Sequence, residues 1–450
     1  MNSPQYKDGL LSQIAIRNFR SIREAEIPLG SRMVVLVGEN AAGKTAVLEA
    51  IAAALGPVIH ALSSNSRKLP LLDFQDFHRV SRAYNGIAEI EREVTFHASL
   101  VDGPSWETVF FVEDSLEPKV RVFRDPGGVQ SVADFLIRND EFPIIAYYGV
   151  ERGARAGERG GGSLRRYSPH QSYDPSDRRA GYLDSLSARA VFDDVERWFE
   201  AYESLELRRQ REDGPNAVDV RLATIRRAVA SVVPEADKLR VIGLPPRLNA
   251  DFTHQSDVQT LPIASLSAGY LSLITIVMDM ARRMAELNPH LDNPLAAAGI
   301  VLIDEIDLHL HPRWQQTVIT ALEETFPKVQ FILTTHSPQI ITTVDAENIR
   351  ILTSRKGKME VHPSTSMEGA RAGRALGEVF GITERPPADV SPFVAALHRY
   401  RREVDQDRWD GPVAEAALTE LQEISPDDPE LHAINVERRR LAVLRGAAKP

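Results

Sequence analysis

The chain contains no cysteine among its 450 residues, which excludes disulfide bonds, thiolate metal sites and a catalytic thiol. It also lacks a long unbroken hydrophobic run. The most apolar early stretch, residues 46–62, is interrupted by Glu49, Gly56 and Pro57, so we expect no membrane span. Residues 1–10 are polar and hold no signal-peptide core. These absences predict a cytoplasmic protein with no membrane role.

An excess of positive charge is absent as well. Lys and Arg number 53 against 63 Asp and Glu, and the net charge of −10 gives no bulk attraction for nucleic acid. Any such contact therefore has to use a local patch. Hydrophobic residues at 43% and charged residues at 26% are typical of a globular protein, and 450 residues are enough for two or three domains.

Near the N-terminus a predicted strand, a glycine-rich loop and a predicted helix follow one another. Alternation over residues 12–17 indicates one strand, and the apolar run 33–37 indicates a second, fully buried one. Residues 38–45, GENAAGKT, then match the phosphate-binding pattern G-x-x-x-x-G-K-[ST] at each fixed position. The nucleotide-binding residues that the motif predicts are Gly38, Glu39, Asn40, Ala41, Ala42, Gly43, Lys44, Thr45 and Ala46.

Each fixed position of this motif has a physical reason. Gly38 and Gly43 let the backbone curl so that its N–H groups point at phosphate oxygens, beside the positive end of the following helix. Lys44 supplies a charge to the β and γ phosphates, and Thr45 offers a hydroxyl to Mg²⁺. A chance glycine-rich turn is the alternative, which the flanking strand and helix disfavour. The motif alone predicts a nucleotide site.

A second part of the same site is predicted far downstream. The apolar run 298–303 ends in Asp304 and Glu305, and parallel strands of such a sheet bring their carboxyl ends to one edge. Asp304 is therefore expected at the Mg²⁺ and Glu305 at the attacking water, unless the two acids are simply solvated. Residues 330–334 indicate another strand, which places His336 near the γ-phosphate.

Between these two parts, Ser267 and Gly269 precede an apolar helix predicted over residues 271–284. Ser267 is a good N-cap residue, and a simple helix cap is the first interpretation of this sequence. The position of Ser267 and Gly269 in the chain, between the two halves of the phosphate site, favours a binding role for them as well.

Together, GENAAGKT (38–45), SLSAGY (265–270), IVLIDEIDLHLHP (300–312) and TTHSP (334–338) resemble the motifs of ABC-type ATPases of the SMC, RecF and OLD group. The resemblance implies an α/β fold, a P-loop ABC-ATPase head with an inserted helical lid or arm and a helical C-terminal tail. Two such heads close around ATP, so Ser267 and the Gly269 backbone would bind the γ-phosphate held by another subunit. Tyr270, where transporter-type signatures often carry Gln or Glu, favours the RecF-like branch.

The same resemblance implies roles for single residues. Lys44, Glu305 and His336 would be the catalytic residues, with Glu305 as general base and His336 as switch histidine. Thr45 and Asp304 would hold the metal, and Asp307 would lie in a loop that contacts the other subunit. Gln75 is a candidate for the Q-loop glutamine of such ATPases, although its flanking pattern is weak.

Two further patterns predict no additional chemistry. His309 and His311 are spaced like a metal pair, but they fall in the subunit-contacting stretch, so we do not expect zinc. Asp405 and Asp407 are spaced like the acid pair of a TOPRIM nuclease. No buried strand precedes them, and we interpret them as a solvated helix face.

Composition changes along the chain predict four segments. They are an ATPase lobe with antiparallel strands (1–150), a flexible basic loop with an inserted helical arm (151–240), a second ATPase lobe (241–365) and a helical, partner-binding C-terminal region (366–450). Residues 151–180 contain seven Arg against four acids, which makes them the candidate for a DNA or RNA contact. A solvated linker is the alternative there.

The C-terminal region resembles the tail of Septu-type and retron-associated (PtuA-like) defence ATPases, including Glu384-Arg385-Pro386 and residues 427–431. In those systems the ATPase assembles with a separate HNH nuclease. The resemblance implies a homo-oligomer, a head-to-tail dimer or larger, that hydrolyses ATP and regulates a partner nuclease in anti-phage defence. The alternatives are a RecF-like DNA repair ATPase without a nuclease partner and a scaffold held together by ATP.

Overall fold

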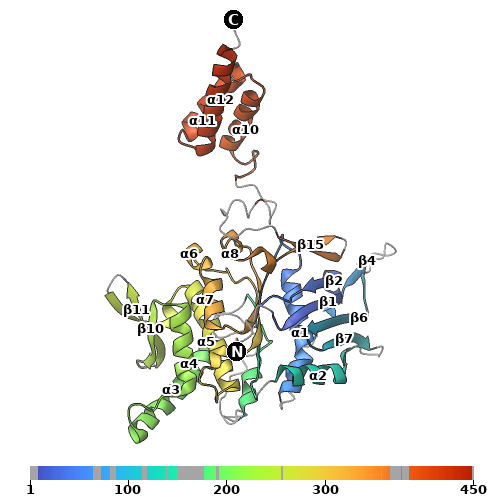
Figure 1. Ribbon diagram of the computed structural model, residues 1–450, viewed down its shortest axis with the longest axis vertical. Helices are drawn as coiled ribbons and strands as arrows, with labels where there is room; N and C mark the ends of the chain where they lie inside the picture. The colour runs from blue at the N-terminus through green and yellow to red at the C-terminus, as the bar shows by residue number, and fades with distance from the viewer. Residues whose placement is uncertain are drawn as a thin grey trace, which may run out of the picture. The chain divides into compact units, whose positions relative to one another are not determined.

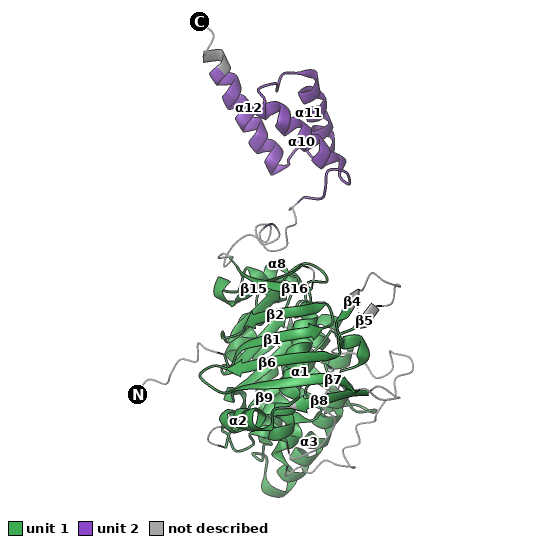
Figure 2. Ribbon diagram, turned by 90° about the vertical axis from the view of Figure 1, so that its right-hand side faces the viewer, with its two compact units in different colours: residues 1–372 green, residues 373–450 purple. Residues whose placement is uncertain are grey.

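The computed structural model describes residues 9–63, 72–81, 88–113, 119–137, 140–150, 177–188, 192–254, 257–355, 357–364, 377 and 385–447. Two compact units make up the chain, Met1–Ala372 and Gly373–Pro450 (Figure 2). Most of the predicted nucleic-acid contact, residues 151–176, lies outside the described residues, as does Glu384 of the tail motif.

A mixed sheet forms the centre of the first unit, with helices packed against it (Figure 1). Its strand order is β8-β7-β6-β1-β2-β16-β15-β3-β14-β13-β9. The strands are β1 (Leu11–Phe19), β2 (Ile22–Pro28), β3 (Met33–Val37), β6 (Glu93–Leu100), β7 (Ser105–Glu113), β8 (Lys119–Arg124), β9 (Ile144–Tyr148), β13 (Gly299–Ile303), β14 (Val329–Thr334), β15 (Ile349–Arg355) and β16 (Lys358–Pro363). The α/β fold class predicted from the sequence is confirmed.

The two halves of this sheet differ in strand direction. The neighbours β3, β14, β13 and β9 are parallel, and the five residues of each of β3, β13 and β9 are buried, as expected for strands covered on both faces. The strands β1, β2, β6, β7 and β8 are antiparallel. Two short strands form a separate sheet: β5 (Ala88–Ile90) pairs with β4 (Arg79–Ser81), whereas β6 joins the main sheet.

Helices cover the faces of this sheet and form the arm. They are α1 (Lys44–Leu62), α2 (Pro126–Leu136), α3 (Phe192–Asp213), α4 (Val220–Val232), α5 (Ala268–Leu287), α6 (Pro312–Gln315), α7 (Val318–Thr325) and α8 (Pro338–Ile341). Among the described residues, α1 is the one helix long and apolar enough to cross a bilayer, and 72% of its most apolar window is buried inside the protein.

The arm combines α3 and α4 with a separate sheet of β10 (Ala236–Ile242), β11 (Arg247–His254) and β12 (Asp257–Pro262). The apolar face of α3 is buried except near its end, where Leu205 is 41% exposed. Glu206 is buried there instead, because Arg226 of α4 donates two hydrogen bonds to its carboxylate. An ion pair thus replaces an apolar contact between the two helices.

Gln330 fastens the antiparallel half of the sheet to the parallel half. Its buried amide accepts hydrogen bonds from the backbone N–H groups of Leu10 and Leu11, at 2.9 and 2.7 Å. The same amide donates to the carbonyl groups of Leu11, Leu29 and Ser31. One side chain of β14 therefore holds the start of β1 and the turn after β2.

Replacing Gln330 by leucine should lower the free energy of unfolding by about 3 kcal/mol, because several buried backbone groups lose their partner at once. Urea unfolding measures this loss. Gln316→Leu is the matched control, since Gln316 is exposed and its amide donates to another side chain, Gln339. An equal, small effect of both changes would contradict the fastening role.

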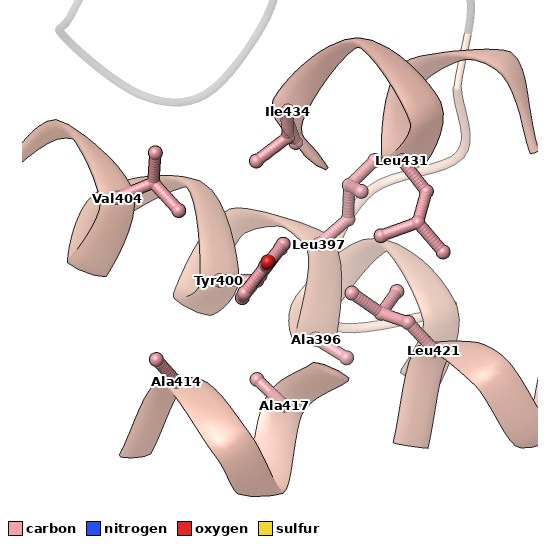
Figure 3. Packing of buried hydrophobic residues seen from close by; sticks show 9 residues of the cluster. All are labelled: Ala396, Leu397, Tyr400, Val404, Ala414, Ala417, Leu421, Leu431 and Ile434. Carbon is pink, nitrogen blue, oxygen red and sulfur yellow. The ribbon is translucent and has the colours of Figure 1, made fainter. Parts of the chain in front are cut away.

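The second unit consists of α10 (Pro392–Asp405), α11 (Pro412–Ile424) and α12 (Pro429–Ala447). Their contact is an apolar cluster (Figure 3) formed by Ala396, Leu397, Tyr400, Val404, Ala414, Ala417, Leu421, Leu431 and Ile434. At the start of the unit, Arg385 forms ion pairs with Asp428 and Glu430, both at 2.8 Å. Asp405 and Asp407 are exposed at the end of α10, so these acids form a solvated face.

Candidate functional site

The carboxyl ends of the parallel strands bring the predicted phosphate-binding residues to one edge of the sheet. β3 leads into Gly38, β14 into Thr335 and β13 into Asp304. Because β14 lies between β3 and β13, segments far apart in the sequence become neighbours here. A ligand site at this edge is the general expectation for parallel α/β sheets.

The loop 38–43 is held in a curled conformation that needs its glycines. Gly43 has φ of 92°, and Ala41 also lies in the left-handed region with φ of 64°. A Cβ on Gly43 would lie 2.7 Å from Cε of Met359, and one on Gly38 would lie 2.5 Å from the carbonyl oxygen of Leu352. The hairpin of β15 and β16 therefore packs directly behind the loop, and its backbone leaves no space for a side chain at Gly38, whereas the positive φ is what favours glycine at position 43.

Lys44 is the first residue of α1 and is only 7% exposed. Its Nζ donates hydrogen bonds to the carbonyl oxygens of Gly38 and Glu39, both at 3.0 Å. Burial lowers the pKa of the ammonium, against the opposing effect of the nearby carboxylates of Asp304, Glu305 and Asp307. A largely dehydrated cation thus lies inside the loop, where an anion would bind strongly.

Asp304 joins the downstream part of the site to the loop. The Thr45 hydroxyl donates to its Oδ2 at 2.9 Å, and the Thr334 hydroxyl donates to its Oδ1 at 2.5 Å. The side chain is 1% exposed, so both oxygens are fixed by these contacts. Thr334 also accepts a hydrogen bond from the backbone N–H of Glu305 at 2.7 Å. From the sequence, Thr334 was the last residue of a predicted strand and the first residue of the TTHSP motif, with no role of its own.

Glu305 and His336 follow these strands directly. Glu305 is half-buried and has φ of 45°, a conformation uncommon for residues other than glycine. Asp307 accepts hydrogen bonds from the Thr335 hydroxyl at 2.6 Å and from the His336 backbone N–H at 3.3 Å. These contacts tie the loop after β13 to the loop after β14, so the structure brings the predicted catalytic residues to the same edge.

Ser267 occupies the N-cap position of α5, as predicted, but its hydroxyl makes no capping hydrogen bond and the residue is exposed. Gly269 is buried against the loop after β13: a Cβ there would lie 2.2 Å from the carbonyl oxygen of His309. The rings of Tyr270 and Trp314 are 4.2 Å apart. The start of α5 is thus anchored beside the loop that contains Glu305, with Ser267 facing solvent.

A charged cluster that no sequence motif indicates lies beside the second turn of α1. Arg20, in the turn after β1, forms ion pairs with Glu49 of α1 and with Asp76. Burial raises the pKa of Glu49, and the Arg20 guanidinium opposes this effect. Gln75 is the neighbour of Asp76 in a short 3-10 helix, Phe74–Asp76, where it is exposed and donates to Asp73 at 3.2 Å. No sequence spacing links Arg20 to Glu49 or Asp76.

The residues at this edge fit a nucleoside triphosphate with Mg²⁺. The curled loop has no space for a side chain at Gly38, Lys44 offers a buried positive charge, and Thr45 with Asp304 offers the oxygen atoms that Mg²⁺ prefers. His311, by contrast, accepts a backbone hydrogen bond from Arg313 at the start of α6. Within the described parts of the chain, no group of three or more His, Asp or Glu side chains is arranged to hold a metal by itself.

The chain is similar to several known proteins. A family model described as "AAA domain, putative AbiEii toxin, Type IV TA system" matches residues 33–342, more than half of the chain. The Escherichia coli protein "Retron Ec83 probable ATPase" is 27% identical over 97% of this chain and 88% of its own. "Septu protein PtuA" of Bacillus thuringiensis is 39% identical over 32% of this chain and 37% of its own. A crystal structure of the SMC head bound to the C-winged helix domain of ScpA covers 80% of this chain and all of its own, at 16% identity and a TM-score of 0.43.

Proposed function

The chain belongs to the AAA-domain family whose model it matches over residues 33–342, and from this premise we propose that it dimerises around ATP and regulates a partner nuclease in anti-phage defence. It is an ATPase of the ABC-type RecF/SMC-like class, related to the retron ATPases and PtuA, as predicted from the sequence. The hydrogen bond between Thr45 and Asp304 carries the proposal for the site, because it joins the loop at residues 38–45 to the strand end at residue 304.

In this proposal the residues of the edge divide the work of hydrolysis. Lys44 and the N–H groups of loop 38–43 hold the phosphates, and the carboxylate of Glu305 orients the attacking water and takes its proton. Mg²⁺, held by Thr45 and Asp304, would neutralise charge on the β and γ phosphates. His336, which follows β14 at this edge, would contact the γ-phosphate as the switch histidine. Positioning and charge neutralisation account for most of the rate in such a reaction.

The second half of the ATP site comes from another copy of the chain. Ser267 supports this step, because it is exposed and its hydroxyl is not used to cap α5. A helix start of this kind offers backbone N–H groups and a hydroxyl to an anion. Two copies placed head to tail would each present Ser267 and the Gly269 backbone to the nucleotide of the other, which creates two equivalent sites in a closed dimer.

Mixing two inactive variants tests this arrangement. Lys44→Ala lacks the phosphate-binding lysine but keeps Ser267. Ser267→Arg keeps Lys44 and loop 38–43 but blocks the contact of its α5 start with the nucleotide of the other copy. In a mixed dimer, one site combines the two intact halves. We expect mixing to restore roughly a quarter of the wild-type ATP turnover, because half of the randomly assorted dimers are mixed and each holds one complete site.

Phosphate release by equimolar mixtures, compared with each variant alone, measures this restoration. Ser265→Arg is the matched control for the arginine change, since Ser265 is also exposed but lies before the helix start. Turnover in the mixture no higher than in the separate variants would show that the two halves of a site do not come from different copies.

For the partner we propose an HNH-type nuclease that binds the second unit. The resemblance of the tail to Septu-type ATPases supports this choice. The unit also exposes apolar side chains, among them Val413 at 53%, Ile424 at 51% and Val436 at 65%. A neighbouring gene for an HNH protein would favour the defence role over a RecF-like repair role.

A further inference from the structure

Tyr148, the last residue of β9, joins two parts of the ATPase through its backbone and its side chain. Its carbonyl oxygen accepts a hydrogen bond from the backbone N–H of Asp304 at 2.8 Å, next to the parallel pair of Ile303 and Tyr148. Its hydroxyl donates to Oδ2 of Asp279 on α5, also at 2.8 Å. Both side chains are buried, with relative exposures of 2% and 3%. One tyrosine therefore connects the strand end that carries Asp304 with the helix that carries Ser267.

Asp279 is the centre of a buried charged cluster. Arg283 donates to its Oδ2 and Arg282 to its Oδ1, both at 2.6 Å. Arg283 also donates to the carbonyl oxygens of Gly181 and Leu183, each at 2.8 Å. Burial alone would raise the pKa of Asp279, but the two arginines hold it well below its ordinary value. Asp279 is therefore a carboxylate that accepts hydrogen bonds from three side chains.

The same cluster reaches the arm. Arg282 donates to Glu286, one turn further along α5, at 3.0 Å. The other oxygen of Glu286 accepts a hydrogen bond from the indole N–H of Trp198 on α3 at 2.7 Å. Buried charges of this kind give little net stability compared with apolar side chains of similar size, whereas they fix one relative arrangement of the elements they join. The cluster fixes α5 against both the sheet and the arm.

We propose that Tyr148 is a positioning residue for ATP hydrolysis, which sets the orientation of α5 and so the place of Ser267 in the site of the second copy. This inference rests on the function proposed above. Asp279 lies 12 residues after Ser267 in sequence, about 18 Å along a straight helix. The helix is thus held at two places, at Asp279 by Tyr148 and at Gly269 by the loop after β13, and losing the first contact changes its tilt and with it the place of Ser267.

Tyr148→Phe removes the hydroxyl and leaves Asp279 paired with both arginines. We expect kcat for ATP hydrolysis to fall about tenfold, because a misplacement of about an ångström between reacting groups has effects of this size or larger. The KM for ATP should stay within about twofold, since Lys44 and loop 38–43 are untouched. Steady-state kinetics at a temperature well below unfolding separates these two quantities.

Tyr182→Phe is the matched control. Tyr182 is 4% exposed, and its hydroxyl donates to the carbonyl oxygen of Pro143 at 2.7 Å, so the change also removes one buried hydrogen bond. It leaves the pair of Tyr148 and Asp279 in place. We expect a comparable fall in melting temperature for both variants and a fall in kcat for Tyr148→Phe alone.

Two outcomes would overturn the inference, and they are distinguishable. If Glu305→Gln loses turnover while Tyr148→Phe has the same kcat as Tyr182→Phe, the ATPase site stands and the positioning role is wrong. If Glu305→Gln hydrolyses ATP like the wild type, the proposed site itself is wrong and the role of Tyr148 falls with it.

Discussion

Glu305→Gln is expected to lower kcat for ATP hydrolysis by about 10²–10⁴-fold, the usual contribution of a general base, while ATP still binds. The amide has the size of the carboxylate but cannot accept the proton of the attacking water. Lys44, Thr45 and Asp304, which hold the phosphates and Mg²⁺ in the proposed site, are unchanged. Phosphate release measures turnover, and titration with a fluorescent ATP analogue measures binding.

Glu324→Gln serves as the control for the Glu305 change. Glu324 is an exposed residue of α7, and its replacement makes the same change in charge away from the strand ends. We expect its turnover to equal that of the wild type. Wild-type turnover by Glu305→Gln would sink the assignment of the general base.

Lys44→Ala is expected to weaken ATP binding on the order of 100-fold, or about 2.7 kcal/mol, the size of a lost charged hydrogen bond to phosphate. The Lys44 ammonium is already dehydrated by the fold, so an anion that binds it has little water to displace. Isothermal titration measures the affinity directly. ATP should also raise the melting temperature of the wild type and not that of the variant, because a ligand stabilises the folded state only when it binds to it.

Lys119→Ala is the comparison for Lys44→Ala. Lys119 begins β8, the edge strand at the opposite end of the sheet from β9, and its loss changes the net charge by the same amount. We expect unchanged ATP affinity for this variant. Equal affinities of the two variants would remove Lys44 from the site.

Local patterns in the sequence predicted the strands that carry the site. The runs 33–37 and 298–303 are continuously apolar, and a strand buried on both faces requires such a run, so β3 and β13 were found within one residue. β2 was missed because charged residues separate its buried residues Ile22, Ala25 and Ile27. The arm sheet was missed for a similar reason, since β12 is exposed along most of its length.

Pairings between distant residues were beyond the sequence. Thr334 ended a predicted strand and began the TTHSP motif without a role of its own, yet it fixes Asp304 and Glu305 because β14 lies directly beside β13. Arg20 meets Asp76 for the same kind of reason, through packing of the turn after β1 against a short helix. Motifs identify the residues that act on one ligand, whereas the hydrogen bonds and ion pairs that hold those residues in place depend on tertiary packing. The catalytic roles of Glu305 and His336 remain predictions.

The strand order has a consequence for how the protein is made. The neighbours of β3 are β14 and β15, which leave the ribosome only after some 300 further residues have been added. The antiparallel strands β1, β2, β6, β7 and β8 find partners among themselves much earlier. During synthesis β3, which leads into loop 38–43, therefore has no neighbouring strand on either side until β14 and β15 have been made. A nascent chain that stops before residue 329 has the complete motif at residues 38–45 but lacks β14, the strand that lies beside β3 and carries Thr334.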